Sequence, residues 1–110
     1  KNEDMRVNFK TMTERIKRSV EEIDPKARVY LYGSRARRTA RKDSDWDILI
    51  LVDQENVTLK DEQRFRHKLV DIELETGQTM STFVYSLKDW FSRLSMTPLF
   101  HNVQKEGILL

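Results

Sequence analysis

The first part of the chain carries apolar side chains at the spacing of an amphipathic helix. Over residues 5–23 they recur at intervals of three and four positions, which places them on one helical face. Asp24-Pro25 ends this predicted helix, because the residue before a proline avoids the helical region. The apolar positions are Met5, Phe9, Met12, Ile16, Val20 and Ile23.

Three later segments are short, apolar and rich in β-forming residues, and they predict strands. These segments are residues 28–32, 46–52 and 80–86. The second is almost continuously apolar, so we expect it to be covered on both faces. Short helices are predicted at residues 34–40, with Ser34 as the N-cap, 87–94 and 98–107.

Residues 58–76 predict a long helix. Thr58 followed by Asp61 resembles a capping box at its start, and Gly77 supplies a stop at its end. Residues 70–75 alternate between apolar and charged side chains, so a strand there is the alternative. We favour the helix, because no upstream position offers as good a stop as Gly77. The alternation of helices and strands predicts a small α/β or α+β domain.

Length and composition narrow the possible functions. The 110 residues suit one domain over residues 1–110. The net charge of +2 is too small to predict nucleic-acid binding, although it does not exclude it. Cysteine is absent, which excludes disulfides and thiolate metal sites. No apolar run approaches the ~20 residues of a membrane helix, and no secretory segment is present. We therefore expect a cytoplasmic protein that does not bind a membrane.

The candidate chemistry lies between the first two predicted strands. Gly33 and Ser34 form a turn at which backbone N–H groups and a hydroxyl can bind phosphate. Asp45 and Asp47 follow at the start of the second strand, where residues two apart point to the same side. Two such carboxylates can hold one or two magnesium ions beside substrate phosphates. Either feature alone is more often structural, but the two together favour a site for a magnesium-bound nucleotide.

Basic residues crowd the segment after the turn. Arginine suits phosphate because its guanidinium is a planar fork of donors. Arg35 lies next to the turn and is the best candidate for a phosphate ligand. The other basic residues of this segment fit a solvated surface equally well, and they are Arg37, Arg38, Arg41 and Lys42.

Two motifs in fixed succession resemble those of the minimal nucleotidyltransferases of the DNA polymerase beta superfamily. They are Gly33-Ser34-Arg35-Ala36-Arg37 and Ser44-Asp45-Trp46-Asp47-Ile48-Leu49-Ile50. The resemblance implies a small mixed β-sheet flanked by helices. It also implies a nucleotidyltransferase that moves a nucleoside monophosphate from a nucleoside triphosphate, with ATP the expected donor, to an acceptor.

The resemblance further implies roles for individual residues. Gly33 and Ser34 would hold the phosphates, and Asp45 and Asp47 would hold a pair of Mg²⁺ ions. Minimal members of the superfamily are often paired with a helical partner protein, so such a partner is also implied.

Two positions depart from the family pattern. Arg38 stands where the family usually has glycine. Catalytic members carry a third carboxylate on a later strand, whereas residues 80–85 hold no acid. Asp71 or Glu73 would fill that role only if residues 70–75 were a strand. The alternative function is therefore a non-catalytic, nucleotide-binding antitoxin-type subunit that masks a helical partner.

Overall fold

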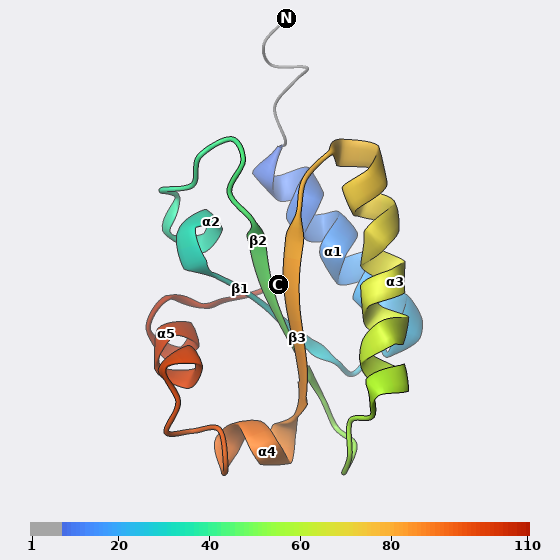
Figure 1. Ribbon diagram of the computed structural model, residues 1–110, viewed down its shortest axis with the longest axis vertical. Helices are drawn as coiled ribbons and strands as arrows, with labels where there is room; N and C mark the ends of the chain where they lie inside the picture. Colours follow the sequence, from blue (N-terminus) through green and yellow to red (C-terminus); the bar gives the residue numbers. More distant parts are fainter. Residues whose placement is uncertain (1–7) are drawn as a thin grey trace, which may run out of the picture.

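A computed structural model of the chain describes residues 8–110 as a β-sheet between two layers of helices (Figure 1). In the view of Figure 1, α1 and α3 lie on one side of the sheet, and α2 and α5 lie on the other. In chain order the elements are α1 (Phe9–Ile23), β1 (Arg28–Tyr32), α2 (Gly33–Arg37), β2 (Trp46–Val52), α3 (Leu59–Thr76), β3 (Met80–Ser86), α4 (Leu87–Phe91), α5 (Pro98–Glu106) and β4 (Ile108–Leu109).

The sheet is mixed and has the strand order β3-β2-β1-β4. β2 pairs in parallel with β3 and antiparallel with β1, and β1 pairs antiparallel with β4. The predicted small mixed sheet flanked by helices is thus confirmed. In this register Tyr32 and Ser81 are the cross-strand partners of Asp47. Because partners in a sheet project to the same face, the three side chains leave the sheet on one side.

Alternation along β2 divides the core into two clusters. On one face, Leu49 and Leu51 pack with Tyr32 of β1, Trp90 of α4 and Val103 of α5. The strand is therefore covered on both faces, as its continuous apolar run predicts, and its buried side chains each contribute roughly 1.5–3 kcal/mol by leaving water. On the opposite face, the cluster beneath α1 and α3 comprises Met12, Ile16, Val20, Val29, Leu31, Trp46, Ile48, Ile50, Val52, Phe65, Leu69, Ile72 and Val84.

The long helix α3 settles the ambiguous segment of the sequence. Thr58 caps it by accepting from the Asp61 N–H at 3.2 Å, and the Asp61 carboxylate accepts from the Thr58 N–H at 3.0 Å. Gly77 ends the helix in the left-handed conformation, so residues 70–75 are helical. The strand alternative is wrong for these residues, and neither Asp71 nor Glu73 reaches the site from a strand.

Several element boundaries differ from the sequence prediction. The first helix begins at Phe9 because the Asn8 side chain caps it, and predicted position Met5 lies outside the described residues. Ser34 is not an N-cap: α2 already begins at Gly33 and ends at Arg37, because Arg38 is left-handed with φ 62°. The helix predicted at residues 87–94 ends at Phe91. The pattern also missed β4, which at two residues is too short to show alternation.

Candidate active site

The turn between β1 and α2 is built around a close approach of the Gly33 backbone to the Asp47 side chain. Gly33 has φ +74°, a conformation that glycine adopts without strain. A Cβ at this position would overlap the Asp47 carboxylate oxygen Oδ2 and lie 3.1 Å from Asp47 Cγ. Glycine is therefore required at position 33 for two reasons: the backbone has a positive φ, and the Asp47 carboxylate occupies the space that a side chain would need. This contact joins the predicted phosphate-binding turn to the predicted metal-binding carboxylate.

The two carboxylates stand at the start of β2 with different surroundings. Asp45 is exposed, whereas Asp47 is half-buried between β1 and β3. Burial raises the pKa of Asp47, and the Asp45 carboxylate raises it further by repulsion. A divalent cation would relieve that repulsion, and aspartate oxygens are the hard donors that Mg²⁺ prefers. The donor set thus fits a metal whose remaining ligands are water and substrate phosphate.

No third ligand completes this pair in the part of the chain that the structure describes, where no three His, Cys, Asp or Glu side chains form a metal-binding group. Ser81 occupies the β3 position opposite Asp47. On the other side, burial, Asp47 and Tyr85 together raise the pKa of Tyr32 to about 12, so its hydroxyl stays protonated near neutrality. The two residues paired with Asp47 on the neighbouring strands, Tyr32 and Ser81, therefore carry hydroxyl groups and no acid.

Arg35 contacts the loop that carries Asp45 and leads into β2. Its Nη2 donates to the Ser44 carbonyl at 2.8 Å and to Gln78 Oε1 at 2.9 Å, and its guanidinium lies 4.7 Å from the centroid of the Trp46 ring. Burial lowers the pKa of Arg35. Gln78 Oε1 also accepts from Trp46 Nε1 at 3.1 Å. Arg35 thus positions the segment that leads into Asp45, and its predicted contact with phosphate remains a prediction.

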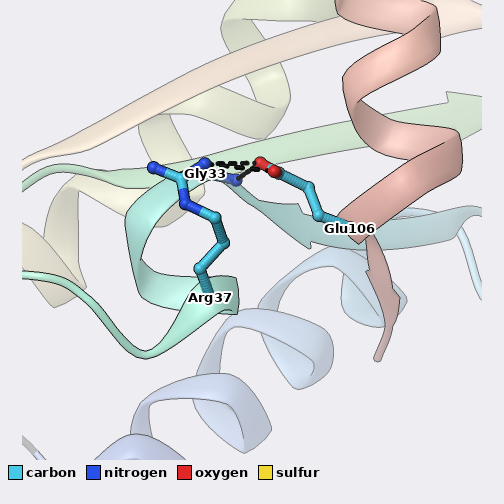
Figure 2. A network of polar contacts seen from close by, with 3 residues as sticks. All are labelled: Gly33, Arg37 and Glu106. Carbon is cyan, nitrogen blue, oxygen red and sulfur yellow. Dashed lines mark hydrogen bonds and ion pairs between the residues drawn. The ribbon is translucent and has the colours of Figure 1, made fainter.

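A second arginine lies at the turn itself. Arg37 Nη1 donates to both carboxylate oxygens of Glu106, at 3.1 Å and 2.9 Å, and the Gly33 N–H donates to Glu106 Oε2 at 2.8 Å (Figure 2). Figure 2 shows the Arg37 side chain reaching from α2, and the Glu106 side chain reaching from the end of α5, toward the Gly33 backbone. The sequence did not single out Glu106 or Gln78, because a polar contact over 73 or 43 residues leaves no local pattern.

Ser34 follows Gly33 in the first turn of α2 and is half-buried. The structure therefore brings Gly33, Ser34 and Asp47 to one end of β1 and β2, with the exposed Asp45 one residue before β2. Arrangements of this kind suit a phosphorylated ligand, because a tight glycine turn, an arginine and two carboxylates supply donors for phosphate and oxygen ligands for its counter-ion.

The family model of the nucleotidyltransferase domain matches residues 13–92. This segment contains the turn, both carboxylates, α3 and β3, and it covers most of the chain. The chain belongs to the nucleotidyltransferase domain family. No curated protein matches this nucleotidyltransferase domain. The matched segment ends before α5, so Glu106 lies outside the part that the family model describes.

Family membership supports nucleotidyl transfer as the general activity of this nucleotidyltransferase domain. The mixed α/β architecture agrees with the fold that the resemblance implied. Within residues 8–110, none of the helices combines the length and the apolar character that crossing a bilayer requires.

Proposed function

We propose that this nucleotidyltransferase domain transfers a nucleoside monophosphate from a magnesium-bound nucleoside triphosphate, with ATP as the expected donor, to an acceptor. The observation that carries the proposal is the packing of the Asp47 carboxylate against Gly33. That contact puts the groups suited to phosphate and the groups suited to metal within one small volume.

Each residue has a task that follows from its chemistry. Backbone N–H groups of the Gly33-Ser34 turn and the Ser34 hydroxyl donate to phosphate oxygens, and Arg37 neutralises part of their charge. Asp45 and Asp47 hold Mg²⁺, which when bound stabilises the attacking and leaving oxygens of an in-line displacement. Arg35 keeps the Ser44–Asp45 segment in place through the Ser44 carbonyl and Gln78. Pyrophosphate leaves as the acceptor oxygen bonds to the α-phosphorus.

Calorimetry with MgATP tests this proposal. Asp47→Ala removes one carboxylate from the site, and we expect MgATP affinity to fall at least tenfold while the protein stays folded. Asp53→Ala is the matched control, because Asp53 is exposed and lies just beyond the opposite end of β2. Chelation of magnesium is expected to reduce binding in the parent protein as the substitution does. Equal MgATP affinity in Asp47→Ala and the parent protein would contradict the proposal.

Ser81 favours a second candidate function. An acid at this position would stand opposite Asp47, and the serine leaves the site one carboxylate short of the family's catalytic pattern. We therefore also consider a non-catalytic, nucleotide-binding subunit that masks a helical partner protein. Transfer of radiolabel from α-labelled ATP to a co-purified partner would favour the enzyme. Stable MgATP binding without transfer, together with inhibition of that partner, would favour the masking subunit.

A further inference from the structure

The strongest unassigned feature is the carboxylate of Glu106 at the Gly33 turn. Three hydrogen bonds hold it: one from the Gly33 N–H at 2.8 Å and two from Arg37 Nη1 at 2.9 Å and 3.1 Å (Figure 2). A backbone N–H and a guanidinium are also what a phosphate oxygen binds in proteins. The Glu106 carboxylate therefore already binds to donor groups that suit a phosphate.

We propose that Glu106 is an internal competitor for phosphate, and that a phosphorylated ligand binds at Gly33 and Arg37 only when the Glu106 carboxylate turns away. This inference rests on the proposed function for the identity of the ligand. It adds an autoinhibitory contact made by α5, which lies outside the segment that the family model matches.

Charge and geometry both prevent the Glu106 carboxylate and a phosphate from binding at the Gly33 turn at the same time. Glu106 Oε2 already accepts from the Gly33 N–H and from Arg37, so a phosphate oxygen cannot take the same donors while it stays. The Glu106 carboxylate also adds negative charge at the same turn against which the Asp47 carboxylate packs. A second anion placed between these carboxylates would meet repulsion from each of them.

Release of Glu106 requires rotation of its side chain only. The backbone around it is fixed, because the Gly107 N–H donates to the Val103 carbonyl at 2.7 Å and β4 continues from there to pair with β1. The Glu106 side chain is 19% exposed and Arg37 is 49% exposed, so the carboxylate can reach water directly. Glutamate has several rotatable bonds, and loss of the contact leaves α5 and the sheet in place.

Binding of inorganic pyrophosphate without divalent metal tests the competition. Glu106→Gln keeps the shape and removes the charge, and Glu106→Ala removes the whole carboxylate. We expect both variants to bind pyrophosphate about tenfold more tightly than the parent, the effect of freeing one or two charge-assisted hydrogen bonds. Glu75→Gln is the matched control, because Glu75 forms a surface ion pair with Arg15 at 3.0 Å.

The three glycines provide the readout. In protein labelled with ¹⁵N-glycine only Gly33, Gly77 and Gly107 give amide signals. Pyrophosphate is expected to shift the Gly33 signal at lower concentration in the variants, while Gly77, at the end of α3, reports that the fold is unchanged. In the parent protein, saturating pyrophosphate should also move Gly107, because the neighbouring Glu106 side chain leaves its site.

Several results would overturn the proposal. Unchanged or weaker pyrophosphate binding in both variants, with the Gly77 signal and the unfolding midpoint of the parent, would make Glu106 a structural clamp. A Gly33 shift in the parent without a Gly107 shift would mean that Glu106 stays in place, and no pyrophosphate binding in any protein would also refute it. The same proteins are then titrated with MgATP: absence of MgATP binding beside the expected pyrophosphate effect would refute the proposed function alone.

Discussion

Replacing Gly33 by alanine tests the contact on which the site depends, and the chain contains its own control. Gly33 has φ +74° and Gly77 has φ +73°, so alanine is strained at both positions. A Cβ at Gly77 meets nothing within 4 Å, whereas a Cβ at Gly33 overlaps the Asp47 carboxylate. The difference between Gly33→Ala and Gly77→Ala therefore measures the cost of displacing Asp47.

The magnitude follows from two contributions. A left-handed backbone costs a non-glycine residue roughly 1–2 kcal/mol, and the loss of unfolded-state freedom returns about 0.4–1 kcal/mol. Gly77→Ala is thus expected to destabilise the protein by about 1 kcal/mol. Overpacking typically costs a further 1–3 kcal/mol, so Gly33→Ala should lower the free energy of unfolding by about 2 kcal/mol more than Gly77→Ala. In a domain of this size that excess corresponds to a Tm lower by about 8 °C.

Urea denaturation of both variants at neutral pH measures the excess, and the Asp47→Ala background isolates its cause. With alanine at position 47, the two nearest of these atoms, Oδ2 and Cγ, are removed, and the Cβ of residue 47 stays 3.4 Å from the new Cβ, an ordinary contact. The excess destabilisation by Gly33→Ala should then disappear, because it arises from the interaction between residues 33 and 47. Equal destabilisation by Gly33→Ala and Gly77→Ala, or an excess that persists in the Asp47→Ala background, would refute the close approach of turn and carboxylate.

Two further variants address the charges around Asp47. Folding raises the pKa of Asp47, so the ionised carboxylate lowers the free energy of unfolding at pH values above that pKa. Asp47→Asn should therefore stabilise the metal-free protein at neutral pH. We expect a gain of only roughly 0.5–1 kcal/mol, because the site is partly solvated. Thermal unfolding should show this gain vanish as pH falls below the ordinary carboxyl range; a gain independent of pH would count against the charge explanation. Ser81→Asp should raise Mn²⁺ affinity at least several-fold in calorimetry by adding a carboxylate opposite Asp47, whereas Ser81→Asn should not. Similar Mn²⁺ affinities for these two variants would show that position 81 does not reach the metal.

The sequence predicts most of the fold because its apolar pattern is locally consistent. The α1 face, the buried run of β2 and the capped helix α3 each follow from periodicity and from the residues at their ends. The ambiguous alternation over residues 70–75 resolves as helix because Thr58 and Gly77 terminate one continuous element. In this case the caps decide what the alternation alone cannot.

The site is only partly readable from the sequence, since its polar contacts join distant segments. Gly33 and Asp47 are marked by a local motif, and the structure brings them together. Arg35 is next to the turn in sequence, but its guanidinium binds Gln78 and the Ser44 carbonyl. Proximity along the chain does not fix where a long side chain points. The arginine that lies at the Gly33 turn is Arg37, two residues after Arg35.

Charge balance links the serine at position 81 to the carboxylate of Glu106. Asp45 and Glu106 both raise the pKa of Asp47, and Arg37 lowers it. An acid at position 81 would add a further negative charge opposite Asp47 and would raise its pKa. Serine at this position avoids that repulsion, so Asp47 ionises more readily, but the site has one possible metal ligand fewer. Arg37 is shared between these effects, because it pairs with Glu106 and stabilises ionised Asp47. A phosphate that takes Arg37 from Glu106 therefore changes the charge that Asp47 experiences, and occupancy of the turn is coupled to the metal-binding carboxylate through one guanidinium.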